Sequence, residues 1–196
     1  TTNLVLLPEK PMKPRFADNR VGFFTTEHAY FNDVQQKVEK REFVHRWRLE
    51  PKPEDVEKYS RGEVVEPVKP IVFYIDPSTP KQWREEIKAG VLDWQAAFEA
   101  AGFKNAVIAK DVPEGDEDFD IDDVRYSVIT YAASEQANAM GPSVVDPRSG
   151  EIIEADVVWW HNVMSLLHSW IQVQTGPIDP RARGNKLSDE HMASAI

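Results

Sequence analysis

The chain has 196 residues and a formal net charge of −10, with 41% hydrophobic and 29% charged residues. This length and composition are typical of one globular domain with a good core, or of one domain with an appendage. The acidic balance, with no basic block against it, argues against nucleic acid or an anionic membrane as the main partner. The sequence has no cysteine, which excludes disulfides, cysteine-ligated zinc and a cysteine nucleophile. No apolar run approaches the roughly 18 residues of a membrane span.

Residues 1–50 are predicted to form an extended or β-rich segment, the end of a preceding domain. The start lacks both Met and a basic region, so it does not resemble a signal peptide and looks cut from a longer chain. The alternation in Glu42–Leu49 favours a strand with His45 on its apolar side, where a hydrogen-bonded structural histidine is favoured over a ligand. Residues 51–70 contain four prolines and many charges and are predicted to be a linker.

Residues 71–196 are predicted to form the main domain. Ile71–Ile75 is continuously apolar and is expected to be a strand buried on both faces. Thr79–Gln82 supplies an N-cap, a first-turn proline and a capping-box Gln, and Gly102 supplies a C-cap, so one long helix is expected between them. Its apolar stripe is expected to pack on a sheet. The stripe consists of Trp83, Ile87, Val91, Trp94, Phe98 and Ala101.

An acidic loop, Val112–Asp123, is expected between strands at Asn105–Ala109 and Val124–Tyr131. Its alternating carboxylates are ligands that hard cations prefer. They are Asp116, Asp118, Asp120 and Asp122. The EF-hand pattern fails, because Ile121 stands where glycine is required and Ser127 where the bidentate Glu is required. A solvated loop and a calcium site are therefore the two interpretations of this stretch.

Ala139–Trp160 is predicted to be a hairpin. Asp146–Gly150 (DPRSG) has the residues of a tight turn, and the alternation from Ile152 to Trp160 predicts one strand after it. The strand before the turn, Ser143–Val145, follows Pro142, which places it at a sheet edge. An edge strand of this kind can accept an extended peptide.

A helix is predicted at Asn162–Gln174. A further helix is expected to begin at Ser188, and the sequence stops at Ile196, about two turns into it. No His-x-x-x-His pair is present, so the five histidines are interpreted as structural, and the residues alone predict neither a catalytic group nor a metal ligand. The predicted fold class is α+β or α/β. We expect a twisted mixed sheet of about five strands with a long packed helix.

Three stretches carry a resemblance to a known family. They are Arg46–Glu50 (RWRLE), Asp123–Tyr131 (DVRYSVITY) and Met140–Asp156 (MGPSVVDPRSGEIIEAD). Together with the order of elements, they resemble the amino-terminal half of a metzincin-type zinc metalloprotease, from a family of large extracytoplasmic bacterial enzymes. The resemblance covers roughly residues 20–196 and is most distinctive over 123–162. It implies an incomplete zincin-like subdomain in the periplasm, at the cell surface or secreted.

In that family, the helix that opens near Ser188 continues into His-Glu-x-x-His-x-x-Gly-x-x-His, which binds zinc and supplies the general base. This sequence does not contain that motif, so zinc is expected in the full-length parent and not in this chain, which is expected to be inactive alone. The resemblance also implies that the edge strand Ala139–Val145 binds the substrate backbone. The candidate residues are Met140, Gly141, Ser143 and Val144, with a gap in the ladder at Pro142. The alternative is an edge strand that a neighbouring segment covers.

Three functions follow as hypotheses. The first is a part of a zinc endopeptidase that hydrolyses peptide bonds in a peptide or protein substrate. The second is a non-catalytic module that binds peptides by strand addition. The third, a calcium-dependent scaffold, depends on the acidic loop alone. We also expect self-association, because a helix beyond Ile196 would cover part of the sheet near Trp159, Trp160 and Trp170.

Overall fold

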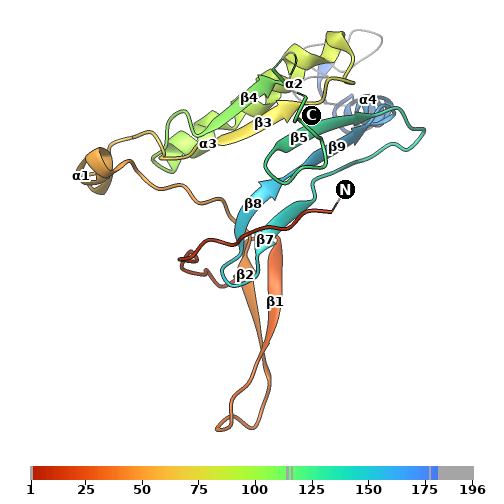
Figure 1. Ribbon diagram of the computed structural model, residues 1–196. Helices are drawn as coiled ribbons and strands as arrows, with labels where there is room; N and C mark the ends of the chain where they lie inside the picture. Colours follow the sequence, from red (N-terminus) through yellow and green to blue (C-terminus); the bar gives the residue numbers. More distant parts are fainter. Residues whose placement is uncertain (1, 114, 116, 177, 181–196) are drawn as a thin grey trace. The chain divides into compact units, whose positions relative to one another are not determined.

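A computed structural model describes residues 2–113, 115, 117–176 and 178–180 (Figure 1). The chain divides into two compact units. Unit 1 consists of Thr1–Arg48 and Ser143–Ala155, and unit 2 consists of Leu49–Pro142 and Asp156–Ile196. Unit 1 is therefore discontinuous in sequence, because a hairpin from the second half of the chain completes it. The sequence-based division at residues 50 and 70 stays a prediction.

Unit 2 is built on a five-stranded sheet with the order β4-β3-β5-β9-β6. Its strands are β3 (Ile71–Ile75), β4 (Val107–Asp111), β5 (Ser127–Ala132), β6 (Ala139–Met140) and β9 (Val157–Trp160). The four strands from β4 to β9 pair in parallel, and β6 is antiparallel to β9 at one edge. The predicted α+β class with a mixed sheet of about five strands is confirmed.

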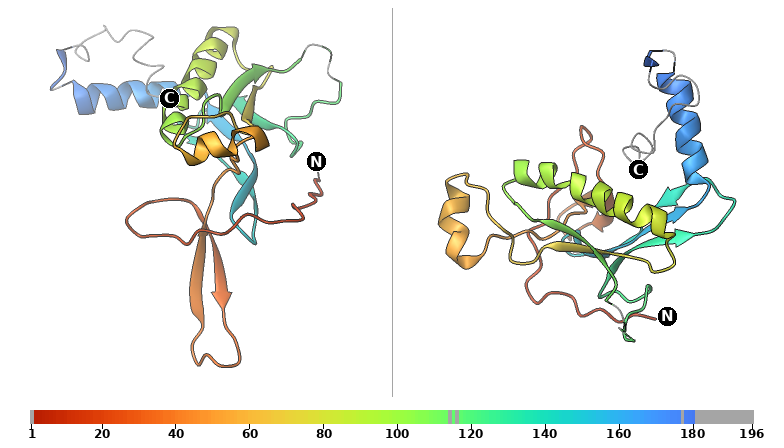
Figure 2. Two further views of the ribbon diagram at one scale, coloured as in Figure 1. Left: turned by 90° about the vertical axis from the view of Figure 1, so that its left-hand side faces the viewer. Right: turned by 90° about the horizontal axis from the view of Figure 1, so that it is seen from above.

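The helical segments of unit 2 are η1 (Pro53–Asp55), α1 (Val56–Ser60), α2 (Lys81–Asp93), α3 (Gln95–Ala100) and α4 (Val163–Thr175). Helix α2 runs across one face of the sheet (Figure 2). It buries Ile87, and its residues Trp83 and Val91 pack against the same core. The core cluster consists of Ile75, Ile87, Ile129, Trp159 and Met164.

The predicted single helix from residue 80 to residue 101 is wrong in two details. Helix α2 ends at Asp93, and Trp94, which is 66% exposed, does not belong to the packing stripe. At the other end the N-cap is Pro80, and the buried Thr79 hydroxyl makes no hydrogen bond among the described residues, so the expected Thr79 cap is also wrong. The predicted end is confirmed, since Gly102 has a φ of +95° directly after Ala101, the C-cap residue of α3.

Unit 1 contains two antiparallel pairs. Strands β1 (Thr25–Tyr30) and β2 (Glu39–Val44) form one hairpin, and β7 (Ser143–Asp146) and β8 (Glu151–Ala155) form the other. The predicted turn is confirmed, because the N–H groups of Ser149 and Gly150 both donate to the Asp146 carbonyl. Gly150 has a φ of +75°, which an L side chain rarely adopts.

The predicted strand from Ile152 to Trp160 is wrong. Strand β8 ends at Ala155, β9 begins at Val157, and the two strands belong to different sheets. The helix expected at Asn162–Gln174 is confirmed as α4, whereas the helix expected at Ser188 lies outside the described residues. Over the described part of the chain, no helix combines the length and the apolar character that a membrane crossing requires.

Candidate functional site

The candidate site is the free edge of β6, the last strand in the sheet of unit 2. Trp160 donates its N–H to the Asn138 carbonyl at 3.2 Å, and Asp156 donates its N–H to the Pro142 carbonyl at 2.9 Å. In an antiparallel ladder, every second residue directs its backbone N–H and C=O toward the partner strand. Asn138, Met140 and Pro142 therefore face β9.

The residues between them, Ala139 and Gly141, consequently direct their backbone groups away from β9. The Ala139 N–H is already used by the Asn138 side chain, at 2.8 Å from its Oδ1. The Ala139 C=O and both backbone groups of Gly141 have no hydrogen-bond partner within the described ranges. Residues 135–144 are all exposed, so this edge is open to an incoming strand.

The structure divides the four predicted substrate-binding residues between two sheets. Met140 and Gly141 lie at the edge of unit 2, but the Met140 backbone is paired with Val158, so only its half-exposed side chain is available. Ser143 and Val144 lie on β7 of unit 1, opposite Ala155 and Glu154 of β8. The predicted gap at Pro142 falls on the β9 side of the strand, because Pro142 and Met140 face the same way. The proline therefore leaves the free edge intact.

Two side chains fix the segment that carries this edge. Asp156 Oδ1 accepts a hydrogen bond from the Val128 N–H at 2.8 Å, and the Asp156 backbone N–H donates to the Pro142 carbonyl. At the other end, Asn162 donates from Nδ2 to the Glu135 carbonyl at 2.9 Å. The sequence pattern did not single out either residue for this role. A strand that is fixed at both ends loses little conformational entropy when a peptide binds beside it.

His161 lies at the carboxyl end of β9, next to this segment. The His161 Nδ1 atom lies 3.1 Å from the Tyr131 hydroxyl, and the backbone N–H of His161 donates to the Ala132 carbonyl. The Tyr131 ring in turn contacts Trp159 edge to face at 5.0 Å between centroids. The exposed His161 residue therefore lies beside Tyr131 at this end of the sheet. Its sequence context gave no signal for this pairing.

The histidines of unit 1 make ordinary structural hydrogen bonds. His45 Nε2 lies 2.8 Å from the Thr26 hydroxyl, and burial lowers the pKa of this imidazole. His28 Nε2 lies 2.8 Å from the Pro147 carbonyl, which only accepts, so His28 carries its proton on Nε2. These contacts fit the structural role predicted for His45.

The described residues do not fit a zinc ion. In the ranges that the structure describes, no group of three or more His, Asp or Glu side chains converges as a metal site requires. In the acidic loop, Asp123 pairs with Arg125 at 2.6 Å, and this hydrogen bond lowers the pKa of the Asp123 carboxyl. Asp116 lies outside the described residues, so the calcium site stays a prediction.

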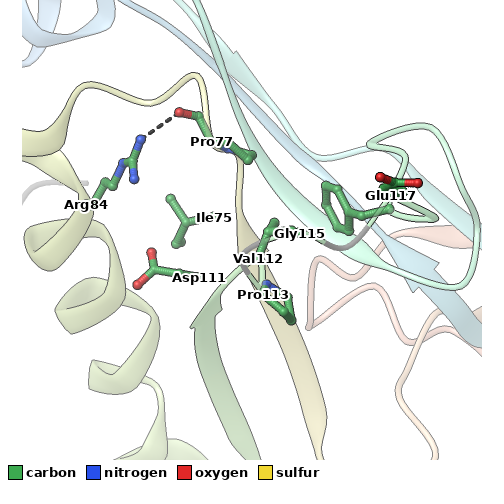
Figure 3. Close-up of a pocket in the computed structure, with 9 residues that line it drawn as sticks. Ile75, Pro77, Arg84, Asp111, Val112, Pro113, Gly115 and Glu117 are labelled. Carbon is green, nitrogen blue, oxygen red and sulfur yellow. Dashed lines mark hydrogen bonds between the residues drawn. The ribbon is translucent and has the colours of Figure 1, made fainter.

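A pocket of about 460 Å³ lies where β3 and β4 end (Figure 3). Its walls are mostly apolar, and two of its three charged residues, Arg84 and Asp111, are engaged in the fold. Arg84 donates to the carbonyls of Thr79 and Pro77 at 2.9 and 2.6 Å, and Asp111 pairs with Lys88. The pocket suits an apolar side chain rather than a charged one. Its lining residues are Ile75, Pro77, Arg84, Asp111, Val112, Pro113, Gly115, Glu117 and Phe119.

Comparison with known proteins gives one family match. A family model described as a domain of unknown function (DUF5117) matches residues 1–52. Neither the curated proteins nor the solved structures contain a match to the chain. The matched stretch is close to the first part of unit 1, Thr1–Arg48, and leaves out the hairpin Ser143–Ala155 that completes that unit.

Proposed function

We propose that this chain is part of a zinc-dependent endopeptidase of the metzincin type, and that the β6 edge binds the substrate backbone. The observation that carries the proposal is the exposed edge at Ala139–Gly141, with its outward backbone groups. The resemblance of Asp123–Tyr131 and Met140–Asp156 to extracytoplasmic bacterial metalloproteases supports it, because these stretches include most of β5 and most of the edge. The substrate class is an extended peptide or protein segment.

An extended peptide would bind beside β6 through main-chain hydrogen bonds. Gly141 would donate its N–H to the peptide, and the carbonyls of Ala139 and Gly141 would accept from it. Each such bond contributes about 1 kcal/mol net, so three of them give weak binding that side-chain contacts must strengthen. The Met140 side chain, on the opposite face of the strand from Ala139, is positioned to make such contacts.

The edge is tested directly with a matched pair of variants. Gly141→Pro removes the outward N–H, whereas Gly141→Ala keeps it, and the added Cβ would lie 3.6 Å from the Asp156 carbonyl oxygen, an ordinary contact. Titration with an acetylated Thr-Val-Thr-Val-Thr peptide, followed by NMR of the paired Met140 and Val158 amides, which all three chains keep, should show saturable binding to the unmodified chain and to Gly141→Ala. Binding that Gly141→Pro leaves unchanged would remove the edge from the proposal.

The zinc part of the proposal is tested on a longer chain. The parent reading frame should encode His-Glu-x-x-His within about 30 residues after Ile196, as the motif of this class requires. A protein that includes this motif should hold one zinc per chain and cleave casein, and replacing the motif Glu by Gln should abolish cleavage while keeping the metal. A reading frame without the motif contradicts the proposal.

A non-catalytic peptide-binding module is the second candidate. The same edge favours it, because strand addition needs only the backbone groups that β6 offers. The two functions differ in one measurement. Peptide binding at Gly141, combined with a longer chain that neither holds zinc nor cleaves casein, would favour the binding module.

A further inference from the structure

The N-terminal segment of unit 1 has a proline at every third position. Residues 8–14 read Pro-Glu-Lys-Pro-Met-Lys-Pro, a repeat that favours an extended polyproline II conformation, and the chain bends at Glu9 and Lys10. Such a segment makes no internal backbone hydrogen bonds, and its prolines have no N–H to donate. Its carbonyl oxygens are therefore the main-chain groups through which another element can hold it.

Three arginines hold this segment by its carbonyls. Arg148 donates from Nη2 to the Pro8 carbonyl at 2.7 Å, and Arg48 donates from Nη2 to the Lys10 carbonyl at 2.9 Å. Arg46 donates from Nη2 to the Lys13 carbonyl. Two of these arginines follow β2 and the third lies in the turn between β7 and β8, so two distant parts of the sequence build one row of donors.

Buried carboxylates orient two of the three guanidinium groups. Arg48 makes two hydrogen bonds to Glu151, at 2.7 and 2.6 Å, and Glu151 is 6% exposed. Arg148 bonds both oxygens of the fully buried Asp146, at 3.0 and 2.7 Å for the shortest contact to each. Bidentate pairing fixes the plane of a guanidinium. The carboxylates thus hold both guanidinium groups in the orientation in which they donate to the carbonyls of the segment.

One side chain of the segment is an anchor. Met12 is 8% exposed, whereas Glu9, Lys10, Pro11 and Lys13 are exposed. The chain then continues alongside β2, where Phe16 forms an isolated β-bridge with Phe43 and the Val44 N–H donates to the Arg15 carbonyl at 2.9 Å. Unit 1 therefore contacts the segment through carbonyls and one apolar side chain, with the lysine side chains pointing outward.

We propose that Arg46, Arg48 and Arg148 form a binding site for an extended proline-rich segment with one apolar anchor, and that residues 8–14 fill this site in cis. The ligand class in trans is the same: a Pro-x-x-Pro-x-x-Pro peptide with methionine or a similar residue at the anchor position. This site lies in unit 1 and is distinct from the β6 edge. The outcome of a test of this site is therefore independent of the outcome for the proposed protease function.

The first test measures occupation in cis. Because the chain has no cysteine, Met12→Cys introduces a single thiol at the anchor, and Cys is itself a small, readily buried side chain. Its labelling by a thiol reagent should be at least tenfold slower than that of Val34→Cys, at a position that is 90% exposed. Equal labelling rates for the two variants would show that the site is not occupied and would overturn the proposal.

The second test measures binding in trans. Met12→Asp should release the segment from the full chain, and a fluorescent peptide of residues 3–17 should then bind at least tenfold more tightly than it binds the unmodified chain. The weaker binding to the unmodified chain is expected because the tethered segment competes at a high effective concentration. The same peptide with Met12→Asp is the matched control. Adding Gly141→Pro to the chain should leave the affinity unchanged.

Two results of this second test would overturn the proposal. One is a folded Met12→Asp chain that does not bind the peptide, and the other is equal binding of the control peptide. If the Met12→Asp chain does not fold, the Met12→Cys chain replaces it. Millimolar peptide should then accelerate labelling of the thiol by displacing the segment, and an unchanged rate would contradict binding in trans.

Discussion

Gly150 is the residue at which a single methyl group is expected to damage unit 1 most. It closes the turn between β7 and β8 with a φ of +75°. A Cβ at this position would overlap the Val44 carbonyl oxygen and lie 3.0 Å from the carbonyl carbon of the same residue. The obstacle is backbone rather than a flexible side chain, so the turn itself has to move in a Gly150→Ala variant.

The size of the effect follows from what that movement breaks. The positive φ alone costs an alanine about 1 kcal/mol. Moving the turn away from Val44 also separates Arg46 from its neighbours, since the Arg46 N–H donates to the Gly150 carbonyl at 3.0 Å and the Arg46 carbonyl accepts from Ile152 at 2.9 Å. At about 1 kcal/mol for each bond, the total loss of unfolding free energy is about 3 kcal/mol.

Gly62 provides the matched control. It also has a positive φ, of +86°, but a Cβ there meets nothing within 4 Å, so Gly62→Ala should cost only the conformational term of about 1 kcal/mol. Hydrogen exchange in β8 reports the unfolding free energy of unit 1, and exchange in α1 reports the region around Gly62. A Gly150→Ala variant that loses no more stability than Gly62→Ala would refute the argument from the Val44 contact.

Three further predictions concern charge, pH and association. Arg48→Ala should destabilise unit 1 by about 3–5 kcal/mol in urea unfolding, because it leaves the buried Glu151 without its ion pair, whereas replacing both residues by Met and Leu should cost much less. Burial lowers the pKa of His45 in the folded state. The stabilising contribution of His45 is therefore complete above about pH 6.5 and is lost as the pH falls through the folded pKa. His45→Gln should remove this slope from the pH profile of unit 1 stability. Trp170 and Val173 are exposed on α4, so sedimentation should show concentration-dependent association that serine at both positions weakens.

The sequence was sufficient where a local signal and the tertiary fold agree. Ile71–Ile75 was predicted with its observed bounds, because a continuous apolar run between prolines has few alternatives to a buried parallel strand. The turn at Asp146–Gly150 and the helix end at Gly102 were also found, because each depends on a positive φ that glycine permits. Helix α4 differs from its prediction by one residue at each end.

Local patterns failed where the partner, rather than the residue itself, decides the structure. Alternation between Ile152 and Trp160 predicts an extended chain, but it does not say which strand lies alongside. Asp156 is the point of change, since its carboxylate accepts the Val128 N–H and so begins a new pairing with β5. Likewise, apolar spacing continued the helix through Trp94, but Gln95 accepts the Ala106 N–H and directs α3 toward the loop before β4.

The candidate site shows the same limit. The sequence placed a peptide-binding edge at Ala139–Val145, and the edge at Ala139–Gly141 lies within that range. It did not identify which backbone groups are free. The direction of the backbone N–H and C=O groups alternates from one residue to the next, and the residues that point away from β9 depend on the register with that strand. That register is fixed by Asn138 and Pro142, through their hydrogen bonds to Trp160 and Asp156.

The stretch that matches DUF5117 cannot form unit 1 without the rest of the chain. Residues 1–52 contain Arg46 and Arg48 but not Glu151, the carboxylate that orients Arg48, or Gly150, whose carbonyl accepts the Arg46 N–H. Without the hairpin, no carboxylate would orient the Arg48 guanidinium, which donates to the Lys10 carbonyl. Strand β2 would also lose the contact between Val44 and Gly150. In the sequence, the hairpin β7–β8 lies between β6 and β9 of unit 2. The segment that completes unit 1 therefore follows directly after the edge that is proposed to bind the substrate. Folding of the matched domain and formation of the candidate site therefore depend on the same continuous stretch, Ala139–Trp160.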